Sequence, residues 1–303
     1  MGRKEWRQEE SKKKNDFGSF CVLVVDSNRM GTAFAQMDPG VRGGKAGAGE
    51  FIPGLTAREQ DFFGFGLIEF SQEEGVEDGF GPRFNMDSCA GCHAQPATGG
   101  TNPSTNPQVE VAKKAGAKDV VPFFITLHGP VREARFKFKA NGQRDGGVQN
   151  LFTITGRVDA QDCIIAQPDF RAAAKNNNLI FHIPTPVFGA GLIENISEDA
   201  IIENKNSKAD LKSKVGIIGK ENRSGNDGTI TRFGWKAQNK SLLMFSGEAY
   251  NVEQGVTNEL FQQERDETPG CVLNFLPEDR TDLIAVEPSN IELFAFFKRR
   301  WCL

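Results

Sequence analysis

The chain is poor in the side chains that usually build metal and phenol sites. It contains one tyrosine, three histidines and six cysteines among 303 residues. Only Cys89 and Cys92 stand two residues apart in the manner of a metal or redox motif. A structural zinc site needs a second Cys or His pair, and His128 and His182 lie too far apart in the sequence to form one. The sequence therefore gives little support for a zinc site, and it contains one cysteine motif to explain.

Long apolar runs and an excess of positive charge are also missing. No stretch of about 18 apolar residues occurs, so the sequence predicts no transmembrane helix. The formal net charge is −4, and nothing in it indicates a nucleic-acid partner. The segment Met1–Lys14 is dense in charge, and the apolar run Phe20–Val25 is too short for the core of a secretory signal. No signal peptide is visible in this sequence.

The length allows one large or two small domains. Residues 1–50 read as a charged leader followed by a glycine-rich segment, and we expect them to form a flexible N-terminal extension. Residues 51–303 then form the folded domain. Phenylalanine occurs 25 times, which suits an apolar cofactor pocket, although ordinary core packing explains most of these residues.

The motif Cys89-Ala-Gly-Cys92-His93 is the attachment pattern of c-type haem. Two thiols at this spacing reach the two vinyl groups on one edge of a porphyrin. The histidine that follows places its imidazole under the iron. Its other ring nitrogen needs an acceptor, for which the carbonyl of Pro96 is one candidate. The sequence therefore predicts one covalent haem c.

Two other interpretations of the same cysteines remain open. A CxxC pair also serves as a dithiol redox centre, usually between a strand and a helix. The spacing also occurs by coincidence. A haem-free dithiol oxidoreductase using Cys89 and Cys92 is thus an alternative to haem binding.

The hydrophobic and turn patterns predict a mainly α protein: a cytochrome c-like haem domain with long loops and a few short β-strands. Capping boxes at Thr56 and Ser289 each predict the start of a helix. Further helices are expected at residues 170–178, 198–212 and 241–252. Strands are expected at residues 120–127, 151–156, 179–183 and 229–235.

Five segments together resemble the bacterial di-haem oxidoreductases, often labelled thiol oxidoreductases and related to di-haem cytochrome c peroxidases. The resemblance covers roughly residues 51–300. Its segments are Gly81–Asn85 leading into the CxxCH motif, Gly129–Phe136, Ile183–Gly189, Arg223–Thr229 and Gly247–Glu253. This resemblance implies an oxidoreductase that transfers electrons through haem, with a peroxidase-like reaction as a further expectation.

Such proteins carry a second CxxCH motif in a following domain, and these 303 residues contain one motif. We therefore expect a truncated member that lacks the second haem domain and is a poor peroxidase alone. A non-catalytic haem-binding fragment is the alternative. We also expect an exposed apolar face at Phe294, Phe296 and Phe297, where the missing domain would pack.

Several side chains are candidates for the chemistry around the haem. Met244 is the candidate sixth ligand, with His128 and His182 as weaker ones. A peroxidase needs an acid–base group above an open coordination site. The candidates for this role and for a radical relay are Glu248, Glu253, Tyr250, Glu194, Trp235 and Trp301, and those for holding the haem propionates are Arg132, Glu133 and Arg135.

Each of these candidates also has a plainer interpretation as a core, surface or hydrogen-bonded residue. The location expected from haem c attachment is the periplasm. An exported location permits a disulfide, and we predict one between Cys163 and Cys271, which lie in loop-like stretches. The partner is an unidentified redox protein, and the sequence does not predict the oligomeric state.

Overall fold

The computed structural model describes residues 48–116, 121–139, 141–144, 157–160, 162–163, 165–263, 268 and 270–301. All of them belong to the unit Ala46–Leu303. The expected extension at residues 1–50 lies almost wholly outside the described residues, and so does the strand predicted at residues 151–156.

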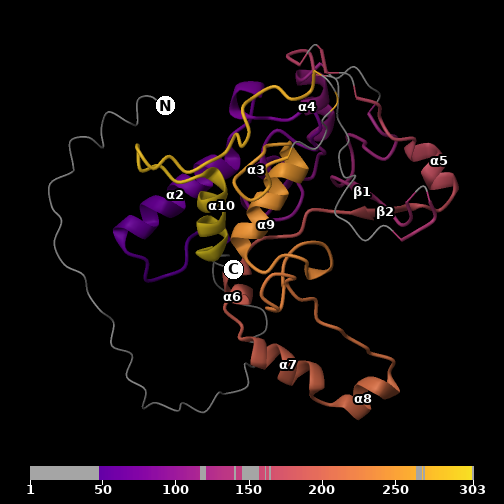
Figure 1. The fold of residues 1–303 in the computed structure, drawn as a ribbon, viewed down its shortest axis with the longest axis vertical. Helices are drawn as coiled ribbons and strands as arrows, with labels where there is room; N and C mark the ends of the chain where they lie inside the picture. The colour runs from indigo at the N-terminus through magenta and orange to yellow at the C-terminus, as the bar shows by residue number, and fades with distance from the viewer. Residues whose placement is uncertain are drawn as a thin grey trace. The chain divides into compact units, whose positions relative to one another are not determined.

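The described residues are mainly helical, which confirms the predicted fold class at this level (Figure 1). The helices are α2 (Ala57–Ser71), η1 (Val76–Asp78), α3 (Cys89–Cys92), α4 (Gln108–Lys114), α5 (Phe170–Lys175), α6 (Ala190–Glu194), α7 (Glu198–Asn206), α8 (Ala209–Lys214), η2 (Trp235–Ala237), α9 (Leu242–Ala249), the π-helix η3 (Tyr250–Gln254) and α10 (Asn290–Arg299).

The one sheet in the described part of the chain has two antiparallel strands, β1 (Glu133–Phe136) and β2 (Leu179–His182). Its register pairs Glu133 with His182. The predicted strand at residues 179–183 is confirmed, whereas those at 120–127 and 229–235 are wrong over their described residues. Both segments contain β-branched residues, which favour strands. Among the described residues, however, neither segment has a neighbouring strand to pair with, and the two form turns and isolated bridges instead.

Helices α2 and α10 pack against each other and supply much of the core (Figure 1). Both predicted capping boxes are present: Glu59 accepts the backbone N–H of Thr56 at 2.9 Å, and Glu292 accepts that of Ser289 at 3.2 Å. The helices approach closely at Gly66, where an added Cβ would lie 2.7 Å from the Leu293 carbonyl oxygen. This glycine weakens the helix locally, but it allows the packing.

The apolar face of α10 is covered within the chain, so the expectation of an exposed face is wrong. Phe297 is 0 % exposed and its ring lies 4.9 Å from that of Phe63 on α2. Phe294 is also buried, and Phe296 packs against Phe62 at 5.5 Å. Helix α2 supplies the apolar surface that was attributed to a missing domain.

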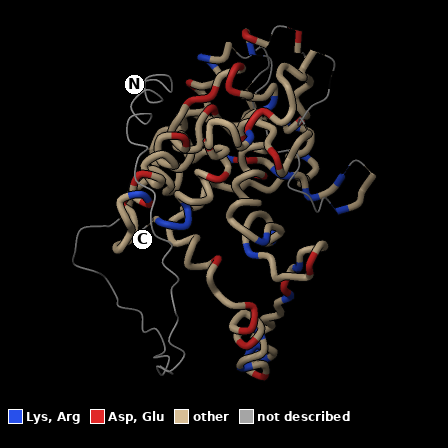
Figure 2. The backbone as a smooth tube through the Cα atoms, turned by 60° about the vertical axis from the view of Figure 1, so that its left-hand side comes forward, with Lys and Arg blue, Asp and Glu red and all other residues tan. Residues whose placement is uncertain are grey.

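The predicted helix at residues 241–252 forms as α9, which continues as the π-helix η3 and ends at Gly255. The predicted helix at 198–212 is divided into α7 and α8, because Lys208 adopts a left-handed conformation with φ of +53°. These two helices project from the remainder of the fold (Figure 1). Acidic and basic residues are interspersed along them (Figure 2).

The predicted disulfide between Cys163 and Cys271 is confirmed, with the two Cα atoms 4.5 Å apart. It joins loops separated by 108 residues of sequence. Across the described segments, none of the helices combines the length and hydropathy that crossing a bilayer requires.

Candidate functional site

The CxxCH motif forms one helical turn, α3, with its functional side chains at the two ends. The Ser88 hydroxyl caps the turn by accepting the Gly91 backbone N–H at 3.3 Å. The His93 backbone N–H donates to the Cys89 carbonyl at 3.0 Å and closes the turn. Cys89 and Cys92 are free thiols of intermediate exposure. One short turn therefore presents two thiols and an imidazole.

The His93 imidazole is held by the backbone of the following loop. Its Nδ1 lies 3.0 Å from the Gly100 carbonyl oxygen, so this acceptor is Gly100 rather than the Pro96 carbonyl considered from the sequence. Burial lowers the pKa of His93, and the backbone carbonyls of Gly100 and Thr185 partly oppose that shift. A neutral ring with its proton on Nδ1 has a free lone pair on Nε2, which is the form that binds iron.

The loop after His93 is packed against two other parts of the chain. Gly99 has φ of +86°, and an added Cβ would lie 1.9 Å from the Trp301 ring. The Gly99 carbonyl accepts the Val187 backbone N–H at 2.8 Å. The Thr101 hydroxyl donates to the Pro184 carbonyl at 2.7 Å. The segment Ile183–Gly189 and the end of α10 therefore fix the loop that carries the histidine's acceptor.

The two thiols are poor nucleophiles in this environment. Burial raises the pKa of Cys89 to about 12, and burial together with the charges of Glu253 and Glu133 raises the pKa of Cys92 well above 9.0. The Cys89 Sγ donates to Gln254 Oε1 at 3.2 Å. Reactive dithiols need a depressed pKa so that a thiolate forms near neutral pH. The environment thus disfavours dithiol redox chemistry.

A pair of carboxyl groups lies beside the CxxCH turn. Glu253, on η3, accepts the Asn85 side-chain N–H at 2.6 Å and is hydrogen-bonded to Glu133 of β1. Burial, then the charge of Glu253, raises the pKa of Glu133 well above 4.5. Glu133 and Glu253 are both half-buried, and the charge of Glu253 makes ionisation of Glu133 more costly. Because its pKa is raised, Glu133 can donate or accept a proton at a higher pH than an ordinary carboxyl group.

The structure separates the three residues predicted as catalytic. Glu253 faces the CxxCH turn, as its effect on the pKa of Cys92 shows. Glu248 instead accepts hydrogen bonds from Gln238 and Asn239, which attach a preceding turn to α9. The Tyr250 hydroxyl donates to Glu74 at 2.8 Å in the core.

The candidate axial ligands other than His93 lie in different surroundings. Met244 is on α9, two residues before Ser246, which accepts from Lys298 of α10 at 3.1 Å. Two residues are about 200° apart around an α-helix, so Met244 lies on the face of α9 turned away from α10. His128 is exposed. His182 packs edge-on against Trp235 with ring centroids 4.6 Å apart, and burial lowers its pKa.

The remaining predicted residues divide between the site and the rest of the fold. Glu194 forms an ion pair with Arg299 at 2.6 Å and accepts the Leu242 backbone N–H. Arg132 lies 5.8 Å from the Phe181 ring, and Arg135 lies 4.8 Å from the Trp235 ring. Both guanidinium groups are thus engaged by aromatic rings.

Four of the five segments that carry the family resemblance meet around the CxxCH turn. They contribute Asn85, Glu133, the Thr185 backbone and Glu253. The fifth segment, Arg223–Thr229, lies elsewhere, where Arg223 pairs with Glu198 and Glu221. Residue-by-residue reasoning missed Asn85, Gln254 and Glu74, although Asn85 stands in a resembling segment. Their contacts span more than 160 residues, and no local pattern indicates such contacts.

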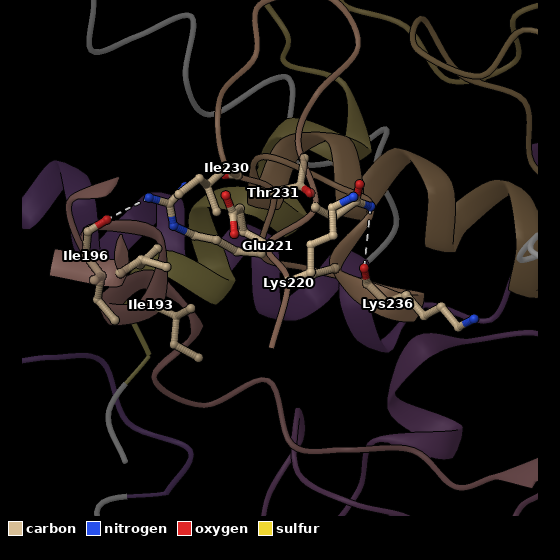
Figure 3. Close-up of a pocket in the computed structure, with 11 residues that line it drawn as sticks. Ile193, Ile196, Lys220, Glu221, Ile230, Thr231 and Lys236 are labelled. Carbon is tan, nitrogen blue, oxygen red and sulfur yellow. Dashed lines mark hydrogen bonds between the residues drawn. The ribbon is translucent and has the colours of Figure 1, made fainter. Parts of the chain in front are cut away.

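A pocket of about 340 Å³ lies beside the start of α7, away from the CxxCH turn (Figure 3). Its polar groups are mostly used within the protein: Arg232 donates to the Ile230 and Ile196 carbonyls, and Glu221 pairs with Lys205 at 2.6 Å. The described residues contain no group of three or more His, Cys, Asp or Glu side chains suited to a metal ion. The CxxCH turn is therefore the stronger candidate site.

The residues of the CxxCH turn suit haem c. Both thiols are unpaired, the imidazole is neutral, and Nδ1 already has an acceptor. The surroundings are apolar: Cys89 packs against the main hydrophobic core, and the Phe70 ring lies 6.1 Å from that of His93. This donor set and apolar wall fit a haem group.

The comparisons with known proteins agree with this chemistry. Residues 134–273 match the family model described as "Di-haem oxidoreductase, putative peroxidase". No curated protein and no solved structure matches the chain. The matched segment carries η3, with Glu253 and Gln254, and both cysteines of the disulfide. Over residues 134–273, the chain is therefore similar to the di-haem oxidoreductase family.

Proposed function

We propose that this chain binds one haem c covalently through Cys89 and Cys92, with His93 as an axial ligand, and transfers electrons. The observation that carries the proposal is the single turn that presents two unpaired thiols and a neutral imidazole. The match of residues 134–273 to the di-haem oxidoreductase family model supports it. Bound haem would supply a reversible one-electron couple and a site at which peroxide reacts.

The chain's own residues have separable roles in this proposal. The Gly100 carbonyl orients His93 and fixes its tautomer. Gln254 positions Cys89 through its hydrogen bond to Sγ. Glu133, with its pKa raised beside Glu253, serves as the acid–base group of a peroxidase-like reaction. Asn85 holds Glu253 in place.

The disulfide supports a location outside the cytoplasm. A bond between Cys163 and Cys271 persists in an oxidising compartment. We propose the bacterial periplasm, because haem c is attached there. The raised pKa values of Cys89 and Cys92 weigh against a haem-free dithiol oxidoreductase in the same compartment.

The decisive test is production of the chain in the periplasm together with a haem-ligation system. We expect the intact mass to show one added haem, which survives denaturation and stains on a gel. The variant Cys89→Ala/Cys92→Ala should carry none, and His93→Ala should change the absorption spectrum through loss of the axial ligand. Cys21→Ser, which removes a thiol outside the motif, is the matched control. An unmodified mass for the wild type would refute the proposal.

The expected activity of the isolated chain is weak peroxide reduction. One attachment motif supplies one metal, so a two-electron reaction leaves an oxidising equivalent that side chains must hold. We expect slow turnover with a reduced cytochrome as donor, and a further decrease in Glu133→Gln and Glu253→Gln. Sustained turnover far above that of free haem, without bleaching, would show that one haem is sufficient.

A further inference from the structure

The only tyrosine of the chain lies inside the core next to a buried carboxylate. Tyr250 is 2 % exposed and begins the π-helix η3. Its hydroxyl donates to Glu74 Oε1 at 2.8 Å and accepts from the Asn290 side chain at 3.2 Å. Glu74 is 5 % exposed. Single-turn π-helices often mark functional sites, and this one also carries Gln254, the partner of Cys89.

The environment prevents the phenol from losing its proton to water. Burial raises the pKa of Tyr250 well above 10.0, and the charges of Glu74 and Asp279 raise it further. Oxidation of a phenol makes it a strong acid, so a buried phenol can be oxidised only if a neighbouring group takes the proton. Glu74 is such a group, because its oxygen already accepts that hydrogen bond at 2.8 Å.

A continuous row of packed rings joins Tyr250 to the proposed haem ligand. The Tyr250 ring lies 5.1 Å from Phe294 on α10, with an interplanar angle of 89°. Phe294 lies 6.0 Å from Phe70 on α2, and Phe70 lies 6.1 Å from His93. Close packing of this kind leaves no water-filled gap between the phenol and the imidazole. An electron therefore has a short route through packed protein.

We propose that Tyr250 is a redox-active tyrosine with Glu74 as its proton acceptor. Tyr250 would lose one electron to a one-electron oxidant, which peroxide would supply when haem is held by Cys89, Cys92 and His93, and its O–H bond breaks as the proton moves to Glu74 Oε1. The products are a phenoxyl radical and a neutral carboxylic acid. Reduction by a partner protein returns the electron, and Glu74 returns the proton. This inference rests on the proposed haem site for its natural oxidant, while the Tyr250–Glu74 pair is independent of it.

The pair can be tested without haem, so a failure here is distinct from a failure of the proposed function. The full-length chain is oxidised by a flash-generated ruthenium(III) polypyridyl complex, and the phenoxyl absorption band is recorded. Since the chain has one tyrosine, this band has one source. We expect the radical to form in the wild type, more slowly in heavy water, and to be absent in Tyr250→Phe.

The decisive variant is Glu74→Gln, which keeps a hydrogen-bond acceptor of the same shape but removes the base. We expect radical formation to slow by about a hundredfold, the low end of what a positioned proton acceptor contributes. Glu77→Gln, an exposed carboxylate three residues away, is the matched control and should behave as the wild type. Circular dichroism checks that both variants fold. An unchanged rate in Glu74→Gln, or in heavy water, would show that the hydrogen bond is only structural.

Discussion

The site core, which comprises α2, α3, η3 and α10, differs from the surface arm at residues 197–220 in how its contacts are made. In the site core, side chains meet across long stretches of sequence: Cys89 and Gln254 are 165 residues apart, and Tyr250 and Glu74 are 176 apart. In the arm, Lys205 reaches Glu221, 16 residues away, and no residue of the arm is buried. The arm leaves Ile218 94 % exposed.

This difference shows where the fold restricts its residues. Long-range contacts in the site core leave little freedom to the CxxCH turn, which preorganises the proposed ligands. The arm lies within the segment that matches the family model, yet it contributes nothing to the CxxCH surroundings. The match to the family therefore contains the arm and η3, whereas α2, α3 and α10 lie outside it.

The largest expected effect on stability comes from a substitution in the packed site core, which the surface arm lacks. Phe297→Ala should lower the free energy of unfolding by about 3–5 kcal/mol, because it leaves a cavity between α2 and α10. Urea denaturation followed by circular dichroism measures this loss. Phe297→Leu, which keeps an apolar side chain, should lose less. Equal stability of Phe297→Ala and the wild type would contradict the packing described for α10.

The next largest effect on stability concerns the disulfide, whose loop contains the surface arm. Cys163→Ala/Cys271→Ala should lower the free energy of unfolding by about 2–5 kcal/mol, since the unfolded chain gains the freedom that a 108-residue loop had lost. The same denaturation measurement, made with and without a reductant, checks it. Reductant should destabilise the wild type and leave the variant unchanged. A wild type insensitive to reductant under denaturing conditions would argue against the bridge.

A smaller effect tests the carboxyl pair of the site through pH. Burial and the charge of Glu253 raise the pKa of Glu133 above its ordinary 4.5, so the folded state keeps a proton that the unfolded state has lost. The wild type should therefore lose stability as pH rises through that window, by at most about 1.4 kcal/mol per pH unit. Glu133→Gln removes this slope. Between about pH 5 and about pH 8, the free energy of unfolding of the variant should rise relative to that of the wild type. Parallel pH profiles of the two proteins would contradict the raised pKa of Glu133.

The smallest effect is expected in the surface arm. Leu211 on α8 is 59 % exposed, so Leu211→Ala should change the free energy of unfolding by no more than about 0.5 kcal/mol. Urea denaturation measures this change in the free energy of unfolding, and Phe297→Ala serves as the variant expected to lose much more. A loss comparable to that of a core residue would mean that the arm is covered by another surface.

Much of the fold and part of the site were predictable from the sequence, for definite physical reasons. The helix starts at Thr56 and Ser289 depend on residues three positions apart, so a local pattern contains the information. The Cys163–Cys271 pairing was also predicted, although from loop character and an expected exported location. The CxxCH motif is likewise local, which is why the residues proposed as ligands could be named.

The errors come from contacts that no local pattern encodes. The segments at residues 120–127 and 229–235 have the composition of strands, but strand formation needs a partner elsewhere in the chain. The exposed face predicted for α10 is buried because α2 covers it. Glycine is unfavourable within a helix, and the reason for Gly66 becomes clear only from the close approach of α10 to α2 at this residue. Glu74 and Gln254 belong to the site only because distant segments fold together.

The disulfide also determines what proteolysis can do to this protein. The exposed loop around Lys208, between α7 and α8, is the kind of segment that proteases cut. That loop lies between Cys163 and Cys271, so a single cut there opens the polypeptide but leaves both pieces covalently joined. The nicked protein would run at full length on a non-reducing gel and as two bands after reduction. Cys89 and Gln254, which come from opposite sides of such a cut, would stay tethered in one molecule.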